Sequence, residues 1–581
     1  MITQPNKLKF PFLQDIKVYT FPTAAKDLLA GITVAVMLIP QGMAYAMLAG
    51  LPPIYGLYAG LIPMILYPLL GTSKQLSVGP VAMVSILVLA GLSPFAEPFS
   101  EDYIQLAILT AILSGLLQIV FAVFRLGFMV KFLSDPVLTG FAASAAIIIA
   151  IGQLPNILGI EALKSGSTVD LLESIFWNLK FTHWLTFLIG GGALFILLLL
   201  KKINRRFPTA LFLLLIGVPT VYYFELYEQG VSIIGEVPSG LPSFEMPNFS
   251  LKDIEQIFPL AIIICLLSFI ESLAIAKTIA TKNDDPPIEA DKELLALGIA
   301  KVVGGFFQSY PTTGSFSRSA VNNDAGAKTG MASIFGAIII GFSLLFLTPY
   351  IYYLPKAILA AIVLSAIVGL INVPKAKFYY KTSRHDFWVM MLTFFGTLIL
   401  GIQNGVLLGI LLSVGYIIYR SSSPTYAVLG HLITGNGVVF RNIERFQKAK
   451  ERDDLLIIRF DAPIYFANAD YFSEIIWTEI YKRKEVPLFL QLDFSSVNSV
   501  DATGLQMLEQ LVDKLNEEQI VLILTNLHGP IRDRLNFAHL LDKIGHENIF
   551  LINKDAYTFT ENPHERNKVK MKIAVQSKKK R

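Results

Sequence analysis

Apolar segments of about twenty residues follow one another from Asp27 to Ser421, and they constrain this chain more than any other feature. A helix needs about 20 residues to cross the hydrocarbon core of a bilayer. We count fourteen such segments, with centres near residues 38, 62, 85, 114, 144, 192, 215, 268, 299, 326, 340, 361, 393 and 411. The sequence therefore predicts an all-helical, polytopic membrane domain with fourteen transmembrane spans.

Basic residues gather in every second loop between these spans. Cytoplasmic loops carry an excess of Lys and Arg. The loops after even-numbered spans hold Lys74, Arg125, Lys131, Lys201, Lys202, Arg205, Arg206, Lys282, Lys292, Lys375, Lys377, Lys381 and Arg384. The opposite loops hold Glu97, Glu101, Asp102, Glu225, Glu228, Glu236 and Glu245. We therefore expect a multi-pass protein of the inner cell membrane with both ends in the cytoplasm. No signal peptide is recognisable before Asp27, so the first apolar segment is expected to remain as a span.

The composition changes after Pro424. Apolar residues make up 54% of the chain and charged residues only 16%, but the last part has an ordinary charged composition. Buried-strand patterns at 455–460, 487–493 and 520–524 alternate there with helical patterns, which indicates a small cytoplasmic α/β domain. The expected parts are a cytoplasmic N-terminal segment (1–26), a transmembrane transport domain (27–423), the α/β domain (434–560) and a basic, disordered tail (561–581).

Several functional classes are excluded by the residues present. The net charge of +4 comes largely from the basic tail, which favours contact with anionic lipid and not with nucleic acid. The only cysteine, Cys265, lies in an apolar segment, so one chain can form neither a disulfide nor a Cys-based metal site. The seven His lack metal-binding spacing, and no P-loop is present. We therefore expect no enzyme, no metal site and no cofactor.

The stretch from Tyr310 to Gly330, YPTTGSFSRSAVNNDAGAKTG, is polar although apolar segments flank it. Irregular backbone and a guanidinium are tolerated at membrane depth only when protein or a watery cavity surrounds them. A short extended piece followed by a helix with Ser317, Arg318 and Ser319 in its first turn would direct N–H groups and a fixed charge at one point. This pattern predicts a membrane protein that binds a small anion.

A weak internal repeat supports this interpretation. The third span follows the sequence Gln75 to Pro80, and the tenth follows Gly314 to Arg318. An interval of seven spans reverses the membrane direction, so the two halves would form an inverted repeat. Broken helices at matching places in two halves indicate a substrate site near the bilayer midplane.

Several long motifs, in the same order, resemble the SulP sulfate permeases, the family of the animal pendrin and prestin transporters. They are DLLAGITVAVMLIPQGMAYAMLAGLPPIYGLYAG, GTSKQLSVGP, ESLAIAKTIA, ELLALGIAKVVGGFFQ and the polar stretch after Tyr310. The last part of the chain resembles a STAS domain (sulfate transporter and anti-sigma-factor antagonist), whose marker is Asp501-Ala-Thr503-Gly504.

The resemblance implies a seven-plus-seven inverted repeat like that of uracil permeases, followed by the STAS domain. In such a fold, a core of spans 1–4 and 8–11 moves against a gate of spans 5–7 and 12–14, an elevator-type alternating-access movement. It also implies a homodimer.

Three neighbouring residues are the first candidates for substrate binding. Arg318 is expected to bind the anion, and the alternative is a structural ion pair. Ser317 and Ser319 either contact the substrate or cap the helix.

The first span adds further candidates. Pro40 is expected to break this span, so that Gln41 can donate to an oxyanion. The alternative for Gln41 is to satisfy the kink. Tyr45 and Phe316 are expected to wall the pocket, although aromatic residues in a span often only pack.

Two more residues are candidates for coupling and regulation. Glu271 lies inside an apolar span and is expected to couple protons to transport, the role that the resemblance also implies. Its alternative is a buried partner for Lys277 or Arg318. Thr503 matches a hydroxyl that is phosphorylated in soluble STAS proteins, but we favour a capping role in a scaffold domain.

Together these features predict sulfate:proton symport, with sulfate or a similar dianion such as a dicarboxylate as substrate. Sodium-coupled bicarbonate uptake or anion exchange is the alternative, with Na⁺ in place of H⁺ as the coupling ion. A membrane-anchored STAS signalling protein without transport is the alternative of a different class.

Overall fold

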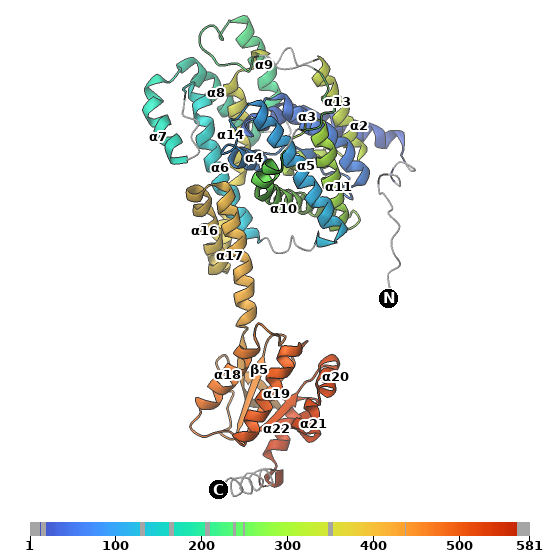
Figure 1. The fold of residues 1–581 in the computed structure, drawn as a ribbon, viewed down its shortest axis with the longest axis vertical. Coiled ribbons are helices and arrows are strands. Elements are labelled where there is room, and N and C mark those ends of the chain that lie inside the picture. The colour runs from blue at the N-terminus through green and yellow to red at the C-terminus, as the bar shows by residue number, and fades with distance from the viewer. Residues whose placement is uncertain are drawn as a thin grey trace. The chain divides into compact units, whose positions relative to one another are not determined.

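In the computed structural model, the described residues are 12, 15, 19–127, 134–161, 168–203, 209–235, 240–247, 250–346, 352–435, 437–565 and 567. Most of the predicted basic tail, and predicted loop residues such as Lys131, Arg205, Arg206 and Glu236, lie outside them. The chain divides into two compact units, Met1–Val414 and Gly415–Arg581, and each is described by itself (Figure 1).

The described part of the membrane unit is mainly helical. Its first half contains α2 (Phe21–Leu48), α3 (Ile54–Leu70), α4 (Ala82–Leu92), α5 (Glu101–Val123), α6 (Asp135–Leu158), α7 (Thr168–Asn178), α8 (Trp184–Ile203) and α9 (Thr209–Tyr223). The second half contains α10 (Leu251–Asn283), α11 (Ala290–Phe306), α12 (Phe316–Asp324), α13 (Met331–Phe346), α14 (Lys356–Ile367), α15 (Val373–Thr382), α16 (Arg384–Leu400) and α17 (Ile402–Ser422). The last of these continues into the second unit.

The predicted spans agree with these helices at all centres but one. The exception is residue 326, which lies in the turn after α12, because α12 is only a short half-helix of 9 residues. Within the described residues, six helical stretches are long and apolar enough to cross a bilayer, or seven if the bent pair α7–α8 counts as one. The other predicted spans are shorter or broken helices.

One expectation about the first span is wrong. α2 continues for 28 residues with Pro40 inside it, so this proline does not break the helix. A proline in a transmembrane helix removes one backbone hydrogen bond, and neighbouring helices can compensate for that loss. Gln41 is therefore presented from a continuous helix.

Helices from the two halves of the membrane unit pack in pairs. α5 packs along α11, and α2 packs along α13 (Figure 1). A Cβ atom added at Gly115 of α5 would lie 2.8 Å from the carbonyl oxygen of Gly298 of α11, and the reverse substitution gives the same distance. The backbones can approach this closely only because both residues lack a side chain. A second group of contacts joins α6, α8, α14 and α16.

The two broken spans cross where each lacks helical structure. β1 (Val78–Gly79) pairs antiparallel with β2 (Thr313–Gly314), with Val78 opposite Gly314. This pairing satisfies backbone groups that lipid could not satisfy. The antiparallel direction agrees with the predicted inverted repeat.

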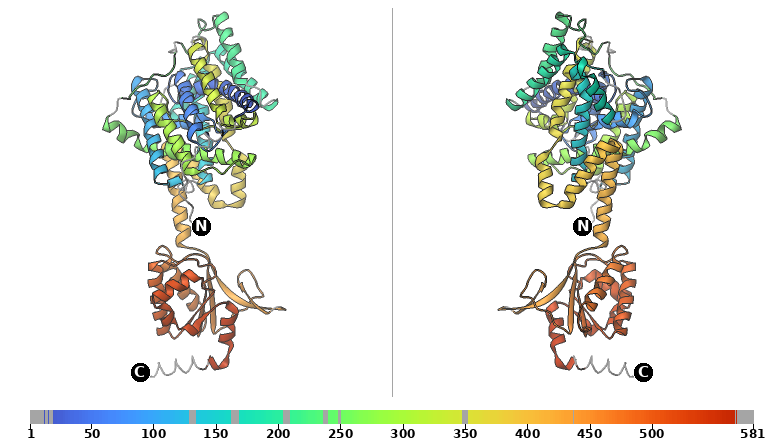
Figure 2. Two further views of the ribbon diagram at one scale, coloured as in Figure 1. Left: turned by 90° about the vertical axis from the view of Figure 1, so that its right-hand side faces the viewer. Right: turned by 90° about the vertical axis from the view of Figure 1, so that its left-hand side faces the viewer.

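The C-terminal unit is a six-stranded sheet with the strand order β4-β3-β5-β6-β7-β8. Strands β5 to β8 are parallel, and the β3–β4 hairpin (orange in Figure 2) is antiparallel. The strands are β3 (Tyr426–Thr434), β4 (Gly437–Asn442), β5 (Leu455–Phe460), β6 (Phe489–Asp493), β7 (Val521–Thr525) and β8 (Ile549–Phe550). The three predicted strands correspond to β5, β6 and β7.

Helices cover both faces of this sheet. On one face pack α18 (Ala469–Tyr481), α19 (Ala502–Glu517), α20 (Gly529–Phe537) and α21 (Leu540–Ile544), and on the other packs α22 (Asn553–Glu561). Alternate residues of β5 point to the two sides: Leu456 and Ile458 to the first core, Leu455 and Ile457 to the second. This period of two confirms the predicted α/β character.

Candidate anion-binding site

The start of α12 is held by hydroxyl groups. Ser315 is the N-cap, and its Oγ accepts a hydrogen bond from the backbone N–H of Arg318 at 3.4 Å. The capping role therefore belongs to Ser315, and the capping alternative for Ser317 and Ser319 is wrong. The Oγ of Ser319 instead accepts from the backbone N–H of Ser77 at 2.9 Å. A hydroxyl of the second broken span thus holds the backbone of the first.

Arg318 lies fully buried beside the crossing of β1 and β2. Its Nη1 donates to the carbonyl oxygen of Pro80 at 2.9 Å, and its Nε donates to Ser77 Oγ at 3.4 Å. Its Nη2 is buried and lacks a hydrogen-bond partner among the described atoms. A Cβ atom at Gly79 would lie 3.2 Å from this nitrogen. The guanidinium is thus fixed on two sides, and one donor group remains for a ligand.

Glu271 faces the same region from α10. Its Oε2 is buried without a hydrogen-bond partner among the described residues, and its carboxyl group lies within electrostatic range of the Arg318 guanidinium and of the Tyr45 hydroxyl. The ion pairs within the described residues do not include Glu271, so it is not the ion-pair partner of Lys277 or Arg318 in this structure. A buried polar atom without a partner is costly, and a bound ligand or proton is one way to offset that cost.

The candidates from the first span lie one turn apart on α2. Gln41 has a buried Oε1 without a hydrogen-bond partner in the described structure, and Tyr45 is buried within electrostatic reach of Arg318. The side chain of Phe316 is 60% exposed, and Ser317 is also exposed. The structure thus places Tyr45 and Glu271 within electrostatic range of Arg318. Phe316 and Ser317 lie instead on the exposed face of α12.

Sequence reasoning did not assign the residues that hold the site together. Ser77 and Pro80 bind Arg318 from more than two hundred positions away, and nothing in either segment specifies this pairing. Tyr310 is fully buried, and its hydroxyl lies 3.0 Å from Ser85 Oγ. It was detectable as the first residue of the polar stretch.

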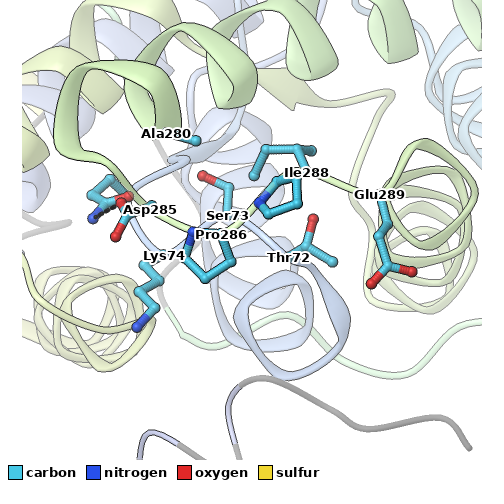
Figure 3. Close-up of a pocket in the computed structure, with 10 residues that line it drawn as sticks. Thr72, Ser73, Lys74, Ala280, Asp285, Pro286, Ile288 and Glu289 are labelled. Atoms are coloured by element: carbon cyan, nitrogen blue, oxygen red, sulfur yellow. Dashed lines mark hydrogen bonds between the residues drawn. The ribbon is translucent and has the colours of Figure 1, made fainter. Parts of the chain in front are cut away.

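A separate small pocket lies between two loops (Figure 3). One wall is formed by Thr72 to Gln75 and the other by Asp285 to Glu289. Gln75 Nε2 donates to Asp285 Oδ2 at 3.2 Å, which links the two loops. None of the residues assigned to the anion site lines this pocket.

In the C-terminal unit, α19 is capped by Asp501 and not by Thr503. Asp501 Oδ1 accepts from the N–H of Gly504 at 2.8 Å, and its Oδ2 accepts from the N–H of Phe466 at 2.9 Å. Thr503 is an exposed residue of the first turn. The favoured capping role of Thr503 is therefore wrong, and its phosphorylation stays a prediction.

The comparisons with known proteins decide the family. Residues 25–393 match the Sulfate permease family, and residues 447–556 match the STAS domain. The chain belongs to the sulfate permease family. The family is one of transporters, so the protein is a multi-pass integral membrane transporter with a C-terminal STAS domain.

Curated relatives of this sulfate permease cover most of its length. It is 36% identical to "Sulfate transporter 4.1, chloroplastic" of Arabidopsis thaliana over 565 residues, which is 94% of this chain and 82% of the relative. It is 34% identical to Sulfate transporter 1.2 of the same plant, over 94% of this chain and 87% of the relative.

Solved structures share the fold of this permease. The murine Solute Carrier 26 family member A9 anion transporter in the inward-facing state superposes with a TM-score of 0.87 at 23% identity, over 95% of this chain and 94% of that one. The transmembrane domain of the cyanobacterium bicarbonate transporter BicA gives a TM-score of 0.58 at 23% identity, over 68% of this chain and 99% of that one.

Proposed function

We propose that this permease takes up sulfate together with protons. Relatives at 36% and 34% identity are named sulfate transporters, which supports sulfate as the substrate. The observation that carries the proposal is that Arg318 Nη2 and Glu271 Oε2 are both buried without a hydrogen-bond partner among the described residues, while the two groups lie within electrostatic range of each other. The first suits an oxyanion, and the second suits a proton.

Charge balance gives the mechanism. Sulfate carries two negative charges, and Arg318 with the ends of two half-helices compensates only part of them. An ionised Glu271 nearby would repel the dianion, and protonation removes that repulsion. Loading of sulfate and loading of a proton are then coupled. We expect Gln41 and Ser317 to donate further hydrogen bonds to the oxyanion.

The packing of the helices supports an elevator-type movement. The helices around the site, α2 to α5 and α10 to α13, pack mainly on one another, and α6, α8, α14 and α16 form a second group. The first group of helices, which carries the site, can then move as a rigid body against the second group. We further propose that the protein is a homodimer in the inner cell membrane with both ends in the cytoplasm.

Uptake by proteoliposomes tests this function. Purified protein is reconstituted, and uptake of labelled sulfate, bicarbonate, chloride and fumarate is measured under an imposed proton or sodium gradient. Sulfate accumulation that needs an inward proton gradient is expected. Sodium-dependent bicarbonate uptake would favour the alternative coupling. Uptake of none of these anions would favour a signalling protein.

A further inference from the structure

A buried lysine lies behind the anion-binding site. Lys301 of α11 is fully buried. Its Nζ donates to Gln118 Oε1 of α5 at 3.2 Å and to Ser268 Oγ of α10. Both partners are neutral, and the ion pairs of the described residues do not include Lys301. Three helices therefore enclose an amine that has no carboxylate beside it.

The surrounding hydrogen bonds fit the charged form of this amine. Gln118 Nε2 donates to the carbonyl oxygen of Cys265 at 2.9 Å and to Ser268 Oγ at 3.0 Å, which leaves its amide oxygen as the acceptor. The hydroxyl of Ser268 donates to the carbonyl oxygen of Cys265 at 3.3 Å. Both atoms that face Lys301 therefore accept, so no neighbouring donor opposes an ammonium group, which carries three N–H donors.

A short path of hydrogen bonds connects this lysine with the crossing of the broken spans. The carbonyl oxygen of Ser268 accepts from Thr313 Oγ1 at 2.8 Å. The hydroxyl of Thr313 lies 3.0 Å from Ser272 Oγ, which accepts from the N–H of Gly314 at 2.8 Å. Ser268 also precedes Glu271 by three residues, about 4.5 Å along the helix axis. The charge thus lies close behind the site.

We propose that Lys301 is a specificity-determining residue, whose positive charge adds to that of Arg318 and makes the site prefer a dianion to a monoanion. This inference rests on the proposed function. A buried charge without a counter-ion is unfavourable, and a bound anion offsets that cost. At an effective dielectric constant of about 20, one unit charge about 10 Å from another changes an equilibrium constant on the order of tenfold.

The test compares binding of two anions of similar shape. Sulfate is the dianion and methanesulfonate the monoanion. Affinities are measured in purified full-length protein from the anion-dependent rise in melting temperature. Lys301→Met removes the charge and keeps the chain length. Lys292→Met is the matched control, because it makes the same change on the same helix at a lysine that pairs with Glu289.

In Lys301→Met, the ratio of sulfate affinity to methanesulfonate affinity should fall about tenfold, whereas Lys292→Met should keep the wild-type ratio. Lys301→Arg restores the charge and should restore most of the ratio. A purely structural role would lower both affinities together, so an unchanged ratio in a folded Lys301→Met protein overturns the inference. If neither anion stabilises the wild type, the proposed anion site itself is wrong, and the inference falls with it.

Discussion

Arg318 Nη1 donates to the carbonyl oxygen of Pro80 at 2.9 Å, so the basic residue of one broken span is fixed by the backbone of the other. The guanidinium group has nitrogens that bind the protein and one nitrogen that is available to a ligand. Two of its nitrogens hold the first half of the membrane unit, and the third has no partner among the described atoms. Both structural partners are neutral and the ion pairs of the described residues do not include Arg318, so the alternative of a structural ion pair is wrong, and substrate binding stays a prediction.

Replacement of Arg318 should affect binding and stability together. Arg318→Ala removes a charge-assisted contact to the anion, worth ~1.5–3 kcal/mol, or about one to two decades in affinity. It also leaves the carbonyl of Pro80 without its donor, so the melting temperature of the anion-free protein should fall. Sulfate binding to the purified variant measures the first effect.

A matched variant separates the two effects. Ser77→Ala removes one structural partner of Arg318 but keeps the guanidinium. It should lower the melting temperature with a smaller loss of affinity. Wild-type sulfate affinity in Arg318→Ala would contradict the binding role.

Glu271→Gln tests the coupling. The amide copies the protonated carboxyl in shape and has no charge, so sulfate should bind at least as tightly as in the wild type, and binding should depend less on pH. Exchange of sulfate across the membrane should persist, because a loaded carrier need not release the proton. Accumulation driven by an inward proton gradient should be lost. If the variant still concentrates sulfate as well as the wild type does, Glu271 is structural.

The crossing of β1 and β2 should not tolerate a side chain at Gly314. A Cβ atom there would lie 2.8 Å from Leu76 Cδ1 and 3.2 Å from the backbone of Ser272. Gly314→Ala should therefore reduce uptake strongly, by displacement of the start of α12. Gly152→Ala on α6 is the control, because a Cβ atom there meets nothing within 4 Å. Equal uptake by both variants would show that the crossing adapts.

The effect of removing the C-terminal unit on transport and aggregation should depend on where the chain is cut. A chain that ends at Ser423 lacks the whole sheet and should insert in the membrane but transport poorly. A chain that ends at Ile433 keeps most of β3 without its partners β4 and β5, and an unpaired apolar strand promotes aggregation. Size-exclusion profiles and sulfate uptake at equal membrane abundance measure both effects. Full uptake by the shorter chain would show that the STAS domain is dispensable for transport.

The spans were predicted well from the sequence because the length and apolar composition of each segment are enough to indicate a membrane helix. The prediction failed at Pro40 and near residue 326, where local signals compete with packing. A proline normally ends a helix, but α2 is enclosed by other helices. The polar residues after Asp324 separate α12 from α13, and composition alone does not locate that boundary.

The site was predicted in part for a similar reason. Arg318 and Glu271 are conspicuous because charge is rare in apolar surroundings. The contacts of Arg318 are not predictable, because Ser77 and Pro80 lie far away in the sequence and Pro80 binds through its backbone carbonyl. Lys301 is also charged, but it lies in the motif ELLALGIAKVVGGFFQ, whose resemblance to the family does not indicate a place near the anion site. Its position behind the site is visible only when α5, α10 and α11 are placed together.

The crossing of β1 and β2 also has a consequence for divergence within the family. β1 and β2 pair through main-chain groups and include two glycines, and the side chains that hold this crossing are those of Ser272, Ser319 and Arg318. Residues such as Gln41, Tyr45 and Phe316 can be exchanged over evolution without loss of the crossing. A family member can thus acquire a new substrate through a few substitutions around the site, while the crossing of β1 and β2 stays unchanged.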